Sequence, residues 1–142
     1  MNQATAVGQK WFNLVQKGDG EAIRELIADD VDFMTPAGQL GNPQDVADFA
    51  MGYHTGFPDA KFRVERWIEE EDVSVAEAVY TGTHTGTLGT PMGDVAPTGR
   101  SVTIPFVSIF GEREGQIAFS HHYWDNAGFM TQLGLMPEPG QA

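Results

Sequence analysis

Cysteine is absent from the sequence, and its absence excludes several kinds of site. None of the 142 residues is cysteine, so the chain forms no disulfide, no thiolate metal site and no cysteine nucleophile. There is also no apolar run near the roughly 20 residues that a membrane-spanning helix needs. The first five residues, MNQAT, lack the basic start and the apolar stretch of a signal peptide. We therefore expect a cytoplasmic protein that has no membrane as a partner.

Positive charge is also scarce. The chain has 8 lysine and arginine residues against 20 aspartate and glutamate residues, which gives a formal net charge of -12. Such a surface repels nucleic-acid phosphates and anionic lipids, so we expect neither as a partner. With 41% hydrophobic residues, a chain of this length can bury a core of its own, and we predict one domain over residues 1–142.

The first half of the chain follows a helical period. Apolar residues recur at spacings of three and four, which predicts helices over residues 4–17, 20–28 and 43–54. Gly18 ends the first of these, Asp19 caps the second and Pro43 opens the third. A short strand is expected at residues 31–34, before Pro36.

The second half alternates apolar and polar residues, as strands do. The alternation predicts long strands over residues 60–70, 73–84, 101–111 and 115–125, followed by a helix or turn over 128–135. Residues 86–99, rich in glycine and proline, are expected to form a flexible lid or a dimer arm. Helices followed by a strand meander predict an α+β fold. A long antiparallel sheet that curves over the helices forms a cone, which leaves a cavity.

Residues 120–125 read Ser-His-His-Tyr-Trp-Asp and hold the densest group of chemically versatile side chains. Neighbours in a strand point to opposite faces. The stretch therefore divides into two sets: Ser120, His122 and Trp124 on one face, and His121, Tyr123 and Asp125 on the other. Either set would place an imidazole and an aromatic ring inside, which favours a pocket, but the alternation leaves open which histidine faces it.

Four motifs follow one another along the chain. They are Phe57-Pro58-Asp59, Gly82-Thr83-His84-Thr85-Gly86, Pro97-Thr98-Gly99-Arg100 and Gln132-Leu133-Gly134. Together they resemble the SnoaL-like polyketide cyclase family. The resemblance implies the nuclear transport factor 2-like fold, a bent sheet wrapped on helices, and a homodimer formed through the sheet. It also implies ring closure in a polyketide ester by an intramolecular aldol reaction, without metal or cofactor.

The same resemblance exposes a departure at the family's catalytic positions. The cyclases carry a His-x-Asp pair on the last strand, and here that pair falls on Ser120 and His122. Polar partners on the preceding strand fall on Phe106 and Ser108. His122 is then the candidate base, because a histidine with an ordinary pKa of about 6.5 accepts protons near neutral pH. Asp125 matches a family carboxylate at the start of the terminal helix, where capping is the default role.

Other residues have two interpretations each. Tyr123 and Asp125 could form an oxyanion site, as a phenol and a protonated carboxyl do in ketosteroid isomerase, or they could serve sheet packing and helix capping. Glu77 is a second candidate base if it points inward, and part of a dimer face if it points outward. His84 either fixes its loop through backbone hydrogen bonds or lies at the cavity mouth. The histidines lack ligand spacing, so we expect no metal site.

Together these residues predict a pocket for a small apolar or polyketide-like molecule. Beyond the apolar lining given by residues such as Tyr80, the candidate ligand contacts are Ser120, Trp124, Tyr123, Phe106, Ser108, His84 and Glu77. We expect a cofactor-independent cyclase or isomerase that moves a proton on a carbonyl compound, with His122 and Asp125 as catalytic candidates. A binding protein that releases its ligand unchanged fits the same pocket, because the His-x-Asp pair is missing. An isomerase of the ketosteroid type is a further alternative.

Overall fold

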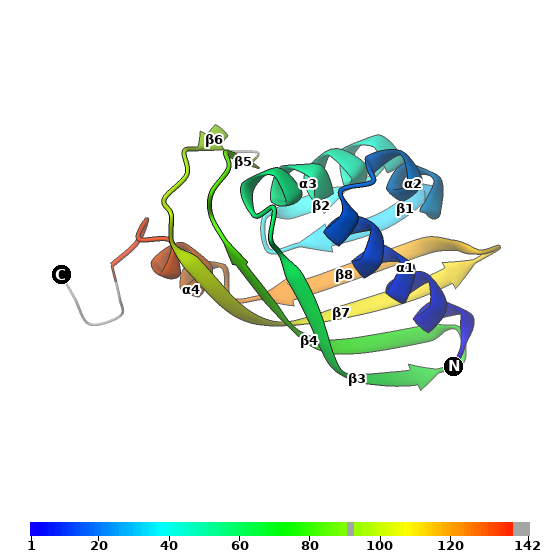
Figure 1. Ribbon diagram of the computed structural model, residues 1–142. Helices are drawn as coiled ribbons and strands as arrows, with labels where there is room; N and C mark the ends of the chain where they lie inside the picture. The colour runs from blue at the N-terminus through cyan, green and yellow to red at the C-terminus, as the bar shows by residue number, and fades with distance from the viewer. Residues whose placement is uncertain (91–92, 138–142) are drawn as a thin grey trace.

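The structure is a computed structural model, and it describes residues 1–90 and 93–137. In chain order the elements are α1 (Gln3–Lys17), α2 (Gly20–Leu26), β1 (Ile27–Thr35), β2 (Gly38–Leu40), α3 (Pro43–Gly56), β3 (Lys61–Glu70), β4 (Val73–Thr83), β5 (Leu88–Thr90), β6 (Gly93–Val95), β7 (Ser101–Arg113), β8 (Gln116–Trp124) and α4 (Asn126–Gln132). Helices α1, α2 and α3 lie over one face of a curved sheet (Figure 1). The expected α+β architecture is therefore confirmed. No helix in the described part of the chain is long and apolar enough to cross a membrane.

The main sheet has six strands in the order β2-β1-β8-β7-β4-β3. The four long strands predicted from the alternation are present, and they pair antiparallel through β3-β4-β7-β8. Strand β1 is longer than expected and runs parallel to β8, with Phe33 opposite Ser120. The sheet is thus mixed rather than wholly antiparallel. No hairpin joins β1 to β8, so the chain is free to bring them together in the same direction.

Irregularities in strand pairing accompany the curvature of the sheet, including one between Ile27 and Asp32 where β1 pairs with β8. The pairing of β3 with β4 shifts between Val64 and Arg66, and that of β7 with β8 shifts between Gly111 and Glu112. Such bulges bend a strand and increase its twist. Gly111 also allows a close approach, because a Cβ there would lie 2.1 Å from Cε1 of Phe119. The bent sheet is concave toward the helices, and the core lies between the two.

Helix α1 begins and ends where its sequence predicts. The Asn2 side chain accepts a hydrogen bond from the Thr5 backbone N–H at 2.9 Å, which satisfies one free donor of the first turn. Gly18 ends the helix in the left-handed conformation, with φ 74°. Between these ends, α1 buries Trp11 and Phe12 against the sheet.

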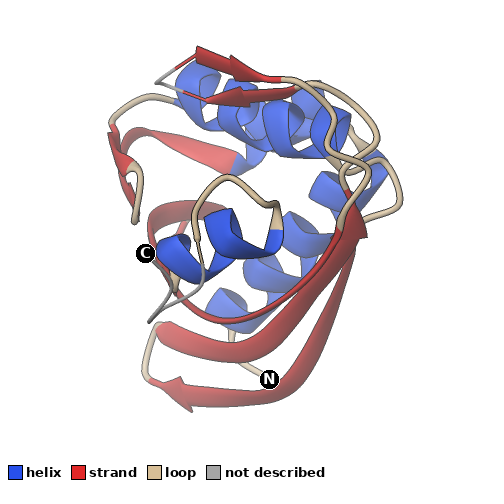
Figure 2. Ribbon diagram, turned by 90° about the vertical axis from the view of Figure 1, so that its left-hand side faces the viewer, coloured by secondary structure: helices blue, strands red, loops and turns tan. Residues whose placement is uncertain are grey.

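A short hairpin, β5 and β6, lies within residues 86–99, the segment expected to form a flexible lid or a dimer arm; residues 91 and 92 of this segment lie outside the described residues. Strands β5 and β6 form a separate two-stranded sheet, which lies against α3 (Figure 2). Leu88 is buried there, and a Cβ on Gly52 of α3 would lie 3.0 Å from the backbone oxygen of Gly89. The hairpin is therefore fixed to the helix that forms one wall of the cavity described next.

Candidate functional site

A cavity of about 80 Å³ lies between the helices and the concave face of the sheet. Helices α1 and α3 contribute Trp11, Phe12 and Tyr53 to its wall, and the sheet contributes Tyr80, Phe106 and His122, among others. Its wall is almost entirely apolar. The volume holds several water molecules or a small fragment, so a larger ligand requires wall side chains to move.

His122 is the imidazole that faces this cavity. It lies on β8 directly opposite Ser108 of β7 and two residues after Ser120. Ser108 Oγ is 2.6 Å from Nδ1, and Ser120 Oγ is 2.7 Å from Nε2. Both ring nitrogens are therefore hydrogen-bonded to serine hydroxyls that are themselves fully buried. His121 lies on the other face, where its Nε2 is 3.0 Å from Asp32 Oδ2.

The surroundings of His122 keep its ring uncharged. Burial lowers the pKa of His122 to about 3, and the nearby His121 contributes in the same direction. Aromatic rings enclose the imidazole, with centroid distances of 4.8 Å to Phe33, 5.9 Å to Trp11 and 5.8 Å to Phe110. A neutral imidazole donates one hydrogen bond and accepts another, and a serine hydroxyl can do either. The two serines can thus satisfy the ring in either tautomer.

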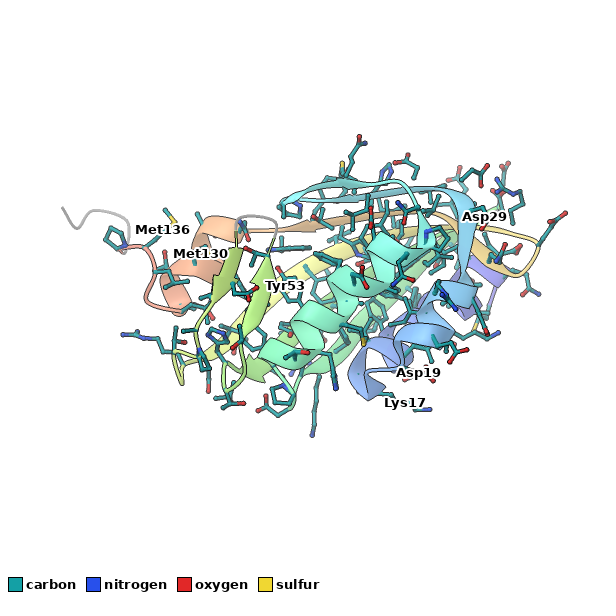
Figure 3. All side chains as sticks on the ribbon, turned by 90° about the horizontal axis from the view of Figure 1, so that it is seen from above. Lys17, Asp19, Asp29, Tyr53, Met130 and Met136 are labelled. Atoms are coloured by element: carbon teal, nitrogen blue, oxygen red, sulfur yellow. The ribbon has the colours of Figure 1, made fainter. Side chains whose placement is uncertain are left out.

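Two tyrosine side chains line the same cavity, Tyr80 from β4 and Tyr53 from α3. Tyr53 lies beside α4, 6.1 Å from Phe129 between ring centroids, and on the side of the molecule where Met130 is labelled (Figure 3). Burial raises the pKa of Tyr53 to about 12. Burial also raises the pKa of Tyr80, with Tyr53 and Asp59 adding to the effect. Both phenols are therefore protonated at neutral pH and can donate hydrogen bonds.

The sequence pattern predicts Tyr80 only as apolar lining and does not single out Tyr53. Two signals were available. Tyr80 shares strand parity with the small, buried Ala76 and Ala78, and Tyr53 follows Phe49 by one helical turn in α3. Neither signal identifies a hydroxyl that lacks a partner, because that depends on what surrounds the ring.

Of the residues that the sequence analysis selected, Trp124 and Phe106 line the cavity together with His122. Ser108 and Ser120 do not line it, and they lie behind the His122 ring as its hydrogen-bond partners. The structure thus brings these five residues together, with the serines as supports of His122 rather than as ligand contacts.

Three other selected residues lie on the outer face of the sheet. Tyr123 is 50% exposed, and the Asp125 carboxylate accepts a hydrogen bond from the Gly128 backbone N–H at 2.8 Å, which caps α4. Because they are outside the cavity, they form no oxyanion site within it. Glu77 also points outward, since its neighbours Ala76 and Ala78 are buried, and its Oε1 lies 2.9 Å from Nε of Arg66.

His84 is fully buried but does not line the cavity. Its Nδ1 accepts a hydrogen bond from the Thr98 backbone N–H at 3.2 Å, and its ring stacks on Phe57 with centroids 5.2 Å apart. Its backbone N–H donates to the Arg100 oxygen, and its own oxygen accepts from Gly99. His84 therefore fixes two motif segments to each other. Across residues 1–90 and 93–137, no three histidine, aspartate or glutamate side chains cluster as metal ligands.

Comparison with known proteins agrees with this geometry. A candidate SnoaL-like polyketide cyclase from Jannaschia sp. CCS1 has a TM-score of 0.80 at 22% identity, with 95% of this chain and 94% of that chain covered. IdmH, a candidate polyketide cyclase from Streptomyces antibioticus, has a TM-score of 0.75 at 25% identity, covering 94% and 99%. A protein with a ketosteroid isomerase-like fold from Catenulispora acidiphila has a TM-score of 0.74 at 17% identity, covering 92% and 93%.

These structural similarities identify the nuclear transport factor 2-like fold that the sequence motifs imply. No curated protein matches the chain in sequence. The family model for the SnoaL-like polyketide cyclases, however, matches residues 5–133, which is nearly the whole chain. The chain therefore belongs to the SnoaL-like polyketide cyclase family.

Proposed function

We propose that this protein is a cofactor-independent enzyme that binds a small, flat, mostly apolar carbonyl compound in the cavity and moves a proton on it. One observation carries the proposal: a neutral imidazole, His122, lies in the wall of an otherwise apolar cavity. Aromatic walls bury a flat ligand over a large area and in a defined orientation. Membership of a cyclase family supports the same assignment.

In the proposed step, a carbon next to the ligand carbonyl gives its proton to a ring nitrogen of His122, and the electron pair of that C–H bond forms an enolate. As in a cyclase, the enolate carbon then attacks the carbon of a second carbonyl group, and the oxygen of that group takes the proton from the imidazolium. As in an isomerase, an enolate conjugated with a C=C bond can instead take that proton at the far carbon of the double bond, which moves the double bond. Before this, Ser108 or Ser120 must turn its hydroxyl away from the nitrogen that reacts. The negative charge that develops on the ligand favours the imidazolium and raises its pKa within the complex.

A second candidate function is ligand binding without chemistry. It is favoured by the same serines, because both nitrogens of His122 already have hydrogen-bond partners in this structure. A pKa of about 3 is also far below the value near the working pH at which a general base is most effective. A binding protein would release its ligand chemically unchanged.

Hydrogen exchange on a model ketone distinguishes the two functions. In D2O, the protein should accelerate replacement of the protons next to the carbonyl of 2-tetralone, followed by proton NMR. His122→Gln keeps an amide donor and acceptor for the two serines but cannot take the proton, so the acceleration should be lost. Positioned proton transfer is typically worth about 10²–10⁴-fold. If 2-tetralone binds but exchanges at its background rate, the binding function holds and the catalytic one is wrong.

A further inference from the structure

The cavity contains a buried hydroxyl that the proposed proton transfer does not use. Tyr80 is 8% exposed, and its hydroxyl has no hydrogen-bond partner in the described part of the chain. A buried polar group without a partner is unfavourable. Phenylalanine would fill the same space without that cost. The presence of the Tyr80 hydroxyl therefore suggests that its hydrogen-bond partner is a bound molecule rather than a group of the protein.

Neighbouring rings hold Tyr80 in place. Its ring is 5.2 Å from Phe62, and 5.8 Å from Phe57 at an interplanar angle of 78°. In the sheet, Phe62 of β3 and Ile104 of β7 lie directly beside it on either side. A ring packed on these sides cannot turn its hydroxyl to the surface. Tyr80 therefore stays in the cavity wall with its hydroxyl buried, and a ligand reaches that hydroxyl only when neighbouring wall side chains move.

Tyr53 supports the same interpretation from the opposite wall. It lines the cavity from α3, where its ring packs against Phe49 and Phe129. The cavity thus presents two phenol groups among aromatic and aliphatic side chains. Because phenols with raised pKa values remain protonated, both serve as donors, and they suit an oxygen acceptor better than a cation.

The tyrosine donor and His122 occupy different parts of the cavity. Tyr80 lies opposite Ile104 and His122 lies opposite Ser108, so Phe106 stands between them on β7. The rings around Tyr80 are Phe57 and Phe62, and neither of these contacts His122. An oxygen bound by Tyr80 is therefore not placed next to the imidazole.

We propose that the Tyr80 hydroxyl is the ligand-recognition group of this cavity, donating a hydrogen bond to an oxygen of a flat, mostly apolar ligand that is separate from the carbonyl group beside His122. This inference rests on the proposed function, since it assumes that the cavity binds a ligand. It adds the polar feature that the ligand carries: an oxygen acceptor at the Tyr80 end, with hydrocarbon around it. A ligand of the same shape without the oxygen gains no hydrogen bond from Tyr80 and therefore binds less tightly.

Two probes of nearly equal shape test this assignment. Acetophenone and α-methylstyrene differ only by a carbonyl oxygen in place of a CH2 group, and NMR titration gives the affinity of each. The protein should bind acetophenone about tenfold more tightly, the scale of one hydrogen bond in a desolvated site. Tyr80→Phe should lose this preference and bind α-methylstyrene at least as tightly as acetophenone, because the acetophenone oxygen would then be buried without a donor. Its melting temperature should not fall, because the removed hydroxyl has no partner in the protein.

Tyr123→Phe is the matched control, since Tyr123 is half exposed on the outer face and should keep the preference for acetophenone. If Tyr80→Phe retains that preference, the assignment of Tyr80 is wrong while ligand binding in the cavity stands. A clear loss of thermal stability in Tyr80→Phe would also contradict it, by showing that the hydroxyl has a structural role. If neither probe binds the unmodified protein, the proposed function fails, and the inference fails with it.

Discussion

Ser108 and His122 face each other across β7 and β8, and the serine hydroxyl lies 2.6 Å from Nδ1 of the imidazole. Because both groups are buried, Ser108→Ala leaves a ring nitrogen without a partner. We expect it to lower the free energy of unfolding by about 1–3 kcal/mol, measured by urea denaturation. The loss in the double variant Ser108→Ala/His122→Ala should be smaller than the sum of the losses in the two single variants by more than about 0.5 kcal/mol. Strict additivity would show that the contact contributes nothing to stability.

The buried imidazole should make stability depend on pH. Its pKa is about 3 in the folded protein, against about 6.5 in an unfolded chain. Between these values the unfolded chain binds a proton that the folded chain does not, so stability rises with pH over this window and falls as the solution is acidified. From pH 7 to pH 5, His122 accounts for a loss of roughly 2 kcal/mol.

The matched comparison for this pH dependence is His122→Gln. Burial lowers the pKa of His84 as well, so the unmodified protein and the variant share that contribution. The difference between their unfolding free energies should therefore shrink by roughly 2 kcal/mol between pH 7 and pH 5. Parallel pH profiles would mean that His122 titrates normally in the folded state.

Two effects restrict position 18 to glycine: its positive φ and the close approach of His54. Gly99 has a similar φ without a close neighbour, so it allows the two effects to be measured separately. Gly18 and Gly99 have φ values of 74° and 73°, but a Cβ on Gly18 would lie 2.4 Å from Nε2 of His54, whereas nothing lies within 4 Å of one on Gly99. Gly99→Ala should cost about 1–2 kcal/mol from the backbone alone. We expect Gly18→Ala to cost more, and His54→Ala to recover the excess. Equal losses, measured by thermal unfolding, would show that the histidine moves aside freely.

Asp125 should act as a helix cap. Asp125→Ala removes the acceptor for the Gly128 backbone N–H and should lower stability by about 1 kcal/mol. Asp125→Asn keeps a side-chain oxygen and should lose little. If Asp125→Asn keeps its stability but loses proton exchange on 2-tetralone, the carboxylate would have a role in chemistry that its position outside the cavity does not suggest.

Strand parity predicted which side chains share a face, but not which face is inside. In β4, both sets contain apolar residues, so Glu77 had an inward and an outward interpretation until the burial of Ala76 and Ala78 decided between them. The same ambiguity held for His121 and His122. It is resolved by contacts from other elements, above all Ser108 across the sheet and Trp11 on α1.

The features that the sequence did not reveal are short or depend on distant contacts. Strands β5 and β6 have three residues each, too few to show an alternating pattern inside a stretch rich in glycine and proline. The parallel pairing of β1 with β8 joins segments far apart in the chain. The unpaired hydroxyl of Tyr80 is a property of its surroundings, and no spacing of residue types encodes it.

The register of β7 has a consequence for the size of the ligand. Tyr80 and His122 lie opposite Ile104 and Ser108, four positions apart along β7 and on opposite sides of it. With ordinary strand dimensions, their backbones are on the order of 16 Å apart. One aromatic ring spans less than about half of that backbone separation. If both groups act on one molecule, their separation along the sheet favours fused-ring or elongated ligands over single-ring ones.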